Sequence, residues 1–438
     1  MRTPILALPL LALAACTDRP LQTTDADTTG SSTSVAPTTD APTTTAPGTT
    51  TGVTTTSTAS TTGVDDTTTT GTTAPVDTTA TATTAPDGPP STCGPPCDAT
   101  WEHFGDLNID AAGDFSCLTR VHGNLTIAAQ SAPAVVATLA NLRTVDENLY
   151  IASHPLTDLS TFACVTDLGQ LSLTGMPQLT DLSALAGLRS AASIHFQDLG
   201  LTALPTFAPD FTGIYGLTLR DNPKLTDLSA ASSWGPLPDG TLGLLLERNT
   251  ALTSLAGLAG LIAASAPNQL QLQLIDHPKL TSLAGLEAAT DVYLYLKQLP
   301  ALTDLDPLKN VVSATYIVLS GIPLVKDLSG LSNLVEAADL QIGDCGDQNS
   351  DGLAGLTSLA GLDSLVHTSS LSLLNNAGLA SLDGAPKLTS VDVSVIAVNN
   401  PALTQKAYDA FLSQLGGPPL EDCLGGWDTC QCFILMPW

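Results

Sequence analysis

Basic and aromatic residues are scarce in this chain. It has 14 lysines and arginines against 42 acidic residues, which gives a formal net charge of −28, and aromatic residues make up only 4%. This charge argues against nucleic acid and against anionic membrane surfaces as partners, and it permits cations. A core with so few aromatic residues must be built mainly from aliphatic side chains.

Motifs for catalysis are also missing. The six histidines are scattered singly, and the chain contains no His-Glu-x-x-His, no Gly-x-Ser-x-Gly and no phosphate-binding loop. A polysaccharide lyase built on a parallel β-helix is an alternative, but it would need arginine or lysine to stabilise a carbanion, and few are present. We therefore predict a protein that is not an enzyme and has no cofactor, with calcium as a candidate ion.

The chain has no segment long and apolar enough to span a bilayer. Met1-Arg2 is a weakly basic start and an apolar run from Ile5 to Leu13 follows. This run is too short to cross a membrane, so residues 1–15 are predicted to be a secretion signal.

Leu13-Ala14-Ala15-Cys16 resembles the lipobox of bacterial lipoproteins. The resemblance implies cleavage before Cys16 and attachment of lipid to its thiol. The alternative is an ordinary signal peptide with a chance cysteine. We expect an exported protein held on the bacterial envelope by its lipid, at the outer membrane or cell surface.

Residues 16–92 begin with this cysteine and continue as a segment of very low complexity. From Leu21 to Thr92 the sequence is nearly all Thr, Ala, Ser, Pro, Gly and Asp, without an aromatic residue, lysine or arginine. Such a composition cannot bury enough apolar surface to offset the loss of chain entropy. We expect a disordered stalk that lifts a folded domain off the membrane.

One phrase repeats between about His154 and Leu403: a turn, Leu-Thr-x-Leu, a Leu-x-x-Leu stretch of small residues and a short Leu-x-Leu strand. The first leucines of the copies are separated by steps of 23, 22, 24, 27, 28, 22, 22, 32, 23 and 24 residues. A period in this range is typical of a solenoid, in which each unit buries its apolar face against its neighbours.

The strand in each unit is predicted from alternation. In Gly216-Leu217-Thr218-Leu219 a period of two places both leucines inward and Thr218 outward. The Leu-x-x-Leu stretches are too short for full helices and should form tight turns or 3₁₀ segments opposite. We expect a mainly β protein in which about 13 strands stack in one parallel sheet, roughly 4.8 Å apart.

Two segments resemble known families. Residues 115–127, Phe-Ser-Cys-Leu-Thr-Arg-Val-His-Gly-Asn-Leu-Thr-Ile, resemble a phrase of receptor L domains. Residues 217–228 are similar to leucine-rich repeats of the short bacterial surface type, with one extra residue between Asn222 and the next leucine, Leu225. The resemblance covers about residues 100–404. It implies a right-handed leucine-rich solenoid that recognises proteins, and it names neither a chemistry nor a ligand.

The folded domain is predicted over 93–404, with a cap over 405–438. Residues 404–415 form an amphipathic pattern, with Tyr408 and Phe411 on its apolar side and Gly416-Gly417 as its end. Nine cysteines leave eight after lipidation, an even number that suggests disulfides in an exported protein. The candidates lie at the ends of the solenoid: Cys93, Cys97, Cys117, Cys423, Cys430 and Cys432. Zinc is the alternative for the two close pairs.

A binding surface is predicted on the outward face of the sheet. Three of the six tyrosines, Tyr293, Tyr295 and Tyr316, fall at outward positions of two adjacent coils. Tyrosine is enriched at interfaces, although it also simply suits strands. The candidate ligand face adds their outward neighbours, Gln271, Gln273 and Lys297.

The step of 32 residues contains an acidic insertion. Asp347-x-Asn349-x-Asp351-Gly352 matches the opening of a calcium-binding loop, but Ser358 stands where a bidentate glutamate belongs. The alternative is a solvated acidic loop. The aspartates and serines that recur in Leu-Thr-x-Leu are predicted to cap turns rather than to bind cations.

These observations predict a lipid-anchored cell-surface protein whose solenoid binds a protein or glycan. The alternatives are a structural envelope component without a specific ligand and, less favoured, a polysaccharide-active β-helix enzyme.

Overall fold

The computed structural model describes residues 94, 96–109, 113–238, 240–266, 269–344 and 352–425. All of them belong to one compact unit, Asp87–Trp438.

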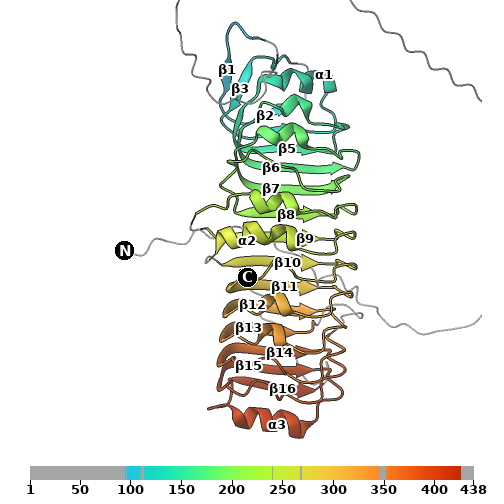
Figure 1. Ribbon diagram of the computed structural model, residues 1–438, viewed down its shortest axis with the longest axis vertical. Helices are drawn as coiled ribbons and strands as arrows, with labels where there is room; N and C mark the ends of the chain where they lie inside the picture. Colours follow the sequence, from blue (N-terminus) through green and yellow to red (C-terminus); the bar gives the residue numbers. More distant parts are fainter. Residues whose placement is uncertain are drawn as a thin grey trace, which may run out of the picture. The chain divides into compact units, whose positions relative to one another are not determined.

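The described residues form one parallel sheet of 16 strands in which nearly every strand pairs with the next along the chain (Figure 1). This confirms the predicted mainly β, solenoid-like fold. The strands are β1 (Trp101–His103), β2 (Leu107–Ile109), β3 (Leu118–Val121), β4 (Leu125–Ile127), β5 (Thr144–Ala152), β6 (Asp167–Met176), β7 (Ser190–Leu199), β8 (Gly216–Arg220), β9 (Leu242–Glu247), β10 (Leu270–Ile275), β11 (Asp291–Lys297), β12 (Ser313–Ser320), β13 (Glu336–Ile342), β14 (His367–Leu374), β15 (Ser390–Val398) and β16 (Glu421–Gly425).

The strand number exceeds the expected 13 for two reasons. The first coils each carry two short strands, with β1 pairing β3 and β2 pairing β4. At the other end, β16 follows the cap helix and pairs with β15. Strand β16 lies in the segment predicted to be a cysteine-rich tail and was not expected from the sequence.

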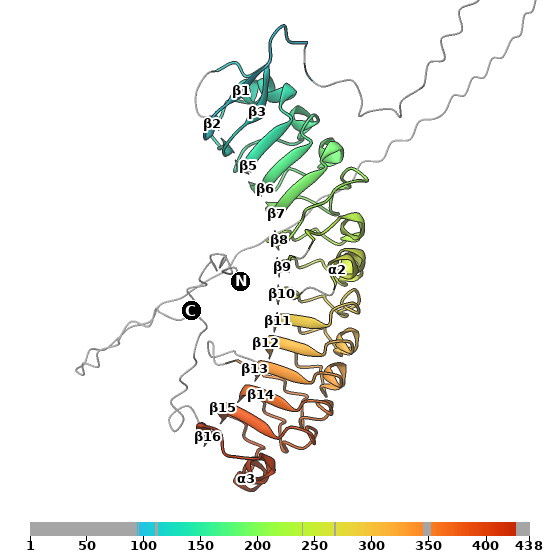
Figure 2. The ribbon, with the colours of Figure 1, turned by 90° about the vertical axis from the view of Figure 1, so that its left-hand side faces the viewer.

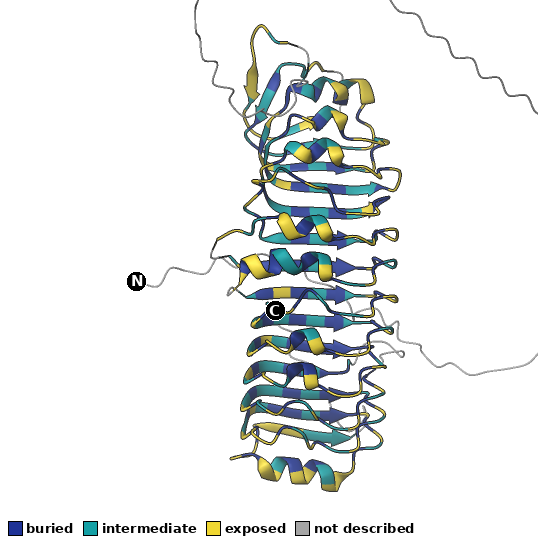
Figure 3. Ribbon diagram, viewed as in Figure 1, coloured by how far each residue is buried: buried dark blue, intermediate teal, exposed yellow. Residues whose placement is uncertain are grey.

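Alternation along the strands separates core from surface, as predicted. The exposed fraction is 1% for Leu217 and 0% for Leu219, while Thr218 between them is partly exposed. Figure 3 shows the same alternation of buried and partly exposed residues along the sheet. Stacked in register, the inward leucines, isoleucines and valines form one continuous core.

Short 3₁₀ turns and helices form the second layer, on the opposite side of the coils from the strands (Figure 2). The 3₁₀ turns are η1 (Ala137–Asn141), η2 (Ser160–Phe162), η3 (Ser183–Gly187), η4 (Ser229–Ser233), η5 (Ala256–Leu258), η6 (Asp306–Leu308) and η7 (Ser329–Leu331), and the helices are α1 (Pro133–Val136), α2 (Ala259–Ser265) and α3 (Gln405–Gln414). Helix α2 departs from the expected tight turn because its coil has a step of 28 residues, which supplies the extra turn.

The repeated aspartates and serines cap turns, as predicted. In Leu-Thr-Asp-Leu the Asp227 carboxylate accepts a hydrogen bond from the Ser229 N–H at 2.8 Å, and Ser254 Oγ accepts from the Ala256 N–H at 3.1 Å in the next coil. The Ser229 bond holds the pKa of the Asp227 carboxyl below its usual range. Equivalent bonds occur at Asp158, Asp181, Ser282, Asp304, Asp327, Ser358 and Ser381.

Each strand from β5 to β15 ends in a residue with left-handed backbone. Its φ lies near +55° at Asp221, Asp276 and Asn399, and near +62° at Gly321. Glycine, asparagine and aspartate tolerate this conformation best. The turn reverses the chain at the same place in these coils, and the residue that follows it is buried in all of them except at Asp344, which is partly exposed and pairs with Lys297.

The predicted cap helix is confirmed. The Thr404 side chain accepts a hydrogen bond from the Ala407 N–H at the start of α3, and Tyr408 and Phe411 are buried against the last coil. The Tyr408 hydroxyl donates to the Val395 carbonyl at 2.7 Å and accepts from the Cys423 N–H at 3.0 Å, which ties α3 to both β15 and β16. Within the described ranges, no helix has the length and apolarity to cross a membrane.

Candidate ligand-binding face

The outward face consists of the strand side chains that alternate with the core residues. Because the strands are parallel and in register, these side chains form columns that run from coil to coil. The central column contains Tyr150, Ser172, His195, Thr218, Leu245, Gln273, Tyr295, Val318, Gln341, Ser372, Ile396 and Cys423.

The predicted tyrosines do come together on this face. Tyr293 on β11 lies opposite Tyr316 on β12, and their rings stack with centroids 5.2 Å apart and planes 28° from parallel. Gln271 lies opposite Tyr293 and Gln273 opposite Tyr295 on the neighbouring β10. The six residues named from the sequence therefore occupy three consecutive strands.

Two members of this group have partners within the chain. The Lys297 ammonium lies 2.5 Å from the Asp344 carboxylate, which follows β13, and Tyr295 is also engaged in contacts. Val318, although outward, is completely buried. Gln271 is exposed and the other five predicted residues are partly exposed, so the patch is accessible at all six positions.

The phenols of the stacked pair stay protonated at physiological pH. Burial raises the pKa of both Tyr293 and Tyr316 above the ordinary value, and at Tyr316 the nearby Tyr293, Tyr295, Asp339 and Asp344 add to the effect. Each hydroxyl therefore remains a neutral group that can donate a hydrogen bond to a partner.

Sequence reasoning missed an ion pair next to this patch. The Arg220 guanidinium on β8 lies 2.8 Å from the Glu247 carboxylate on β9, and the Glu247 side chain is only 10% exposed. Arg248 bonds both Glu247 and Asp221. The pair could have been predicted from spacing, since Arg220 and Glu247 are 27 residues apart, which equals the step between their coils and places them opposite each other on neighbouring strands.

His195 lies in the central column one strand away from Thr218. Burial lowers its pKa, so the ring is neutral at physiological pH, and Nε2 lies 3.3 Å from the Gln197 amide oxygen. Together with the ion pair, His195 makes the face over β7–β9 polar but without net charge.

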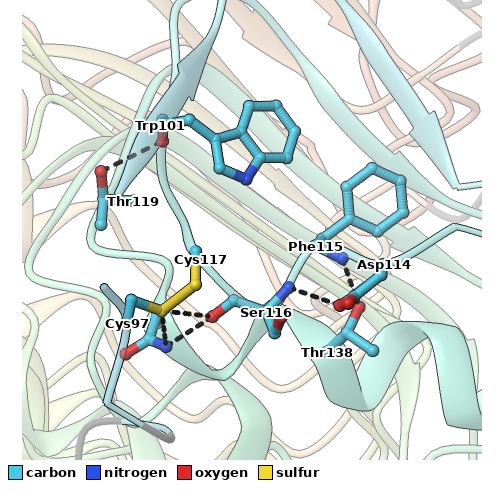
Figure 4. The surroundings of a disulfide bond; sticks show 9 residues. Cys97, Trp101, Asp114, Phe115, Ser116, Cys117, Thr119 and Thr138 are labelled. Atoms are coloured by element: carbon cyan, nitrogen blue, oxygen red, sulfur yellow. Dashed lines mark hydrogen bonds between the residues drawn. A yellow bond between two sulfur atoms is a disulfide. The ribbon is translucent and has the colours of Figure 1, made fainter. Parts of the chain in front are cut away.

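A disulfide joins two of the predicted cysteines at the N-terminal end. Cys97 and Cys117 are bonded with their Cα atoms 5.7 Å apart (Figure 4). The Asn141 amide donates to the Ser116 carbonyl at 2.5 Å, and the Phe115 N–H donates to Thr138 Oγ1 at 3.0 Å, so η1 is attached to this bridge. Cys164 and Cys423 each take part in a disulfide as well.

The remaining predicted site residues lie outside the described residues: Cys16, Cys93, Cys430, Cys432, Asp347, Asn349 and Asp351. Lipidation and calcium binding therefore stay predictions. Gly352 is described, and a Cβ atom there would lie 2.2 Å from the Asn375 carbonyl oxygen. Close packing against β14 thus requires a glycine at this position whether or not calcium binds.

Within the part of the chain that the structure describes, no three histidine, cysteine or acidic side chains form a metal-binding group. No family model matches the chain, and no curated protein is significantly similar to it.

Proposed function

We propose that this is a lipid-anchored cell-surface protein whose outward face binds another protein or a glycan. The observation that carries the proposal is the sheet itself: polar and aromatic side chains stand in register along it, and the described 3₁₀ turns and helix α2 lie on the other side, with α3 at the end of the stack (Figure 2). A wide, regular face of this kind is how solenoid proteins engage partners.

The stacked tyrosines favour a protein partner over a glycan. Tyr293 and Tyr316 each use one ring face against the other, so the stacked pair offers fewer ring faces to a partner than two separate tyrosines would, while its ring edges and hydroxyls remain. Sugar recognition would benefit from an open ring face, whereas edges and hydroxyls suit the mixed polar and apolar contacts of protein interfaces.

The proposed lipid anchor and the low-complexity stalk would position the binding face relative to the membrane. Lipid on Cys16 would hold the chain on the envelope, because several acyl chains together give stable anchoring. A flexible segment of 72 residues has a root-mean-square reach of roughly 45–50 Å, which would place the binding face beyond the immediate membrane surface.

Capture from envelope extract tests the binding function. The full chain should retain a partner, and Tyr293→Ala with Tyr316→Ala should lose it. Tyr150→Ala is the matched control, because Tyr150 is a partly exposed outward tyrosine six strands away on β5. Equal capture by all three proteins, or none by any, would favour a structural envelope component without a specific ligand.

Metabolic labelling with a fatty-acid probe tests the anchor. The wild-type chain should take the label and Cys16→Ser should not. A Cys16→Ser protein that is still labelled would contradict lipidation at this residue while leaving the binding face untouched.

A further inference from the structure

A second, small apolar cluster lies on the outward face over the last coils. It consists of Leu374 on β14 and Val398 on β15, with Ile396 and Cys423 packed against it, and it is separate from the main core. Leu374 lies opposite Val398, which in turn lies opposite Gly425, the last residue of β16.

These side chains are buried although they point away from the core. Leu374 is 2% exposed and Val398 is 0% exposed. Leu374 lies near the start of the acidic insertion, because the Asn375 amide donates a hydrogen bond to the Asp344 carbonyl. Val398 has Leu374 on one side but only Gly425, which has no side chain, on the other. Its neighbours within the sheet therefore do not account for its complete burial, and a further layer must lie above Val398.

We propose that the C-terminal segment, residues 426–438, is this layer and docks on Leu374, Val398 and Ile396. The segment leaves β16 at Gly425, directly beside Val398. Its last six residues, Phe433-Ile434-Leu435-Met436-Pro437-Trp438, are all apolar. Burying them on an apolar patch removes both surfaces from water.

The length of the segment suffices. Thirteen residues span up to roughly 43–47 Å when extended, whereas crossing back over β15 and β14 requires only about 10 Å. The undescribed stretch 345–351 reads Cys-Gly-Asp-Gln-Asn-Ser-Asp and offers little apolar surface to such a patch. The C-terminal segment is the part of the chain whose composition matches the cluster.

This docking does not rest on the proposed binding function, but it restricts where a partner can bind. The outward face over β14–β16 is occupied by the chain's own end, so an external ligand must use the strands before β14. The cysteines Cys430 and Cys432 lie within the same segment, which gives a means of fixing it covalently.

Trp438 is a built-in reporter for the test. The difference between the emission spectra of the full chain and of Trp438→Phe isolates this tryptophan from Trp101, Trp234 and Trp427. Docking predicts emission at shorter wavelength than free tryptophan and acrylamide quenching reduced several-fold. Emission and quenching equal to those of free tryptophan would overturn the proposal.

Substitutions on the patch identify the docking surface. Val398→Asp should shift Trp438 to the emission and quenching of an exposed side chain, whereas Ile275→Asp, in the same column of β10, should leave it unchanged. If a protected Trp438 ignores Val398→Asp, the segment docks elsewhere and the proposal is wrong.

Deletion of residues 426–438 covers the case in which Val398→Asp fails to fold. The shortened chain should melt cooperatively and bind several-fold more of the dye ANS than the full chain, because Leu374 and Val398 become exposed. Dye binding unchanged by the deletion would mean that another layer, such as a second copy of the chain, covers the patch.

Discussion

At the residue scale, the position that follows the left-handed residue links neighbouring coils by side-chain hydrogen bonds. In four coils it is occupied by a buried asparagine: Asn222, Asn249, Asn376 and Asn400. The Asn249 amide donates to the Leu219 carbonyl at 2.8 Å and its oxygen accepts from the Asn222 N–H at 3.2 Å. One side chain thus satisfies backbone groups of the preceding coil, which would otherwise be buried without partners.

Replacing Asn249 with leucine should destabilise the domain by about 3 kcal/mol, because it leaves the Leu219 carbonyl and the Asn222 N–H buried and unpaired. Leucine fits this position sterically, since Leu299 occupies it two coils later. Denaturant titration measures the loss. The control is Asn310→Leu: this exposed asparagine donates to the Glu287 carbonyl at 2.7 Å, and its loss should cost less than about 1 kcal/mol. Equal losses would mean that burial does not set the cost.

His277 occupies the same position in the next coil and makes the domain sensitive to acid. Its side chain is completely buried, and burial lowers its pKa to about 4. The unfolded histidine titrates near its ordinary pKa of about 6.5. Between these two values the unfolded state binds more protons, so stability falls as the pH drops from about 6.5 towards 4.

His277→Asn should remove this part of the pH dependence. One unit of pKa shift corresponds to about 1.4 kcal/mol, so the wild-type chain should lose up to about 3 kcal/mol more than the variant between pH 7 and pH 4. Asparagine is the matched replacement, because Asn249 fills the position one coil earlier. Urea titrations of both proteins at the two pH values measure the difference, and parallel pH profiles would contradict the assignment to His277.

At the scale of the strand, the phase of alternation determines which substitutions the fold tolerates. Leu217→Asp places an unpaired charge between two coils and should unfold the domain, since such burial costs several kcal/mol. Thr218→Asp, one residue away and partly exposed, should shift the melting temperature by only a few degrees. Similar thermal melts for the two variants would show that the strand is in the opposite phase.

The strands and turns were predictable because each coil repeats the same pattern of alternating apolar residues followed by a turn. Alternation placed Leu217 and Leu219 inward, and the interchange of Asp227 with Ser254 at one repeat position indicated turn caps. Strand β16 was not predictable, because Glu421–Gly425 lacks the leucine pattern and is placed by pairing with β15 after the chain has passed through α3. Helix α2 could be foreseen only as extra length, because its coil has 28 residues between corresponding leucines where most coils have 22–24.

At the scale of the whole domain, the sequence located the candidate face but not how open it is. Gln271, Tyr293 and Tyr316 were placed together by register alone, which follows from the repeat length. The pairing of Lys297 with Asp344 could not be foreseen, because it joins residues 47 positions apart across an irregular insertion. Contacts within the repeat are thus encoded in the period, and contacts made by insertions are not.

The uniform left-handed turn at the end of each strand also bears on how such a gene can change. Because every coil leaves the sheet at the same place and touches mainly its neighbours, an in-frame tandem duplication of 22–24 codons would insert one more coil without disturbing the rest. Each added copy would lengthen the sheet by about 4.8 Å. Slippage during replication would therefore alter the length of the outward face in discrete steps, while the two ends of the folded domain stay the same.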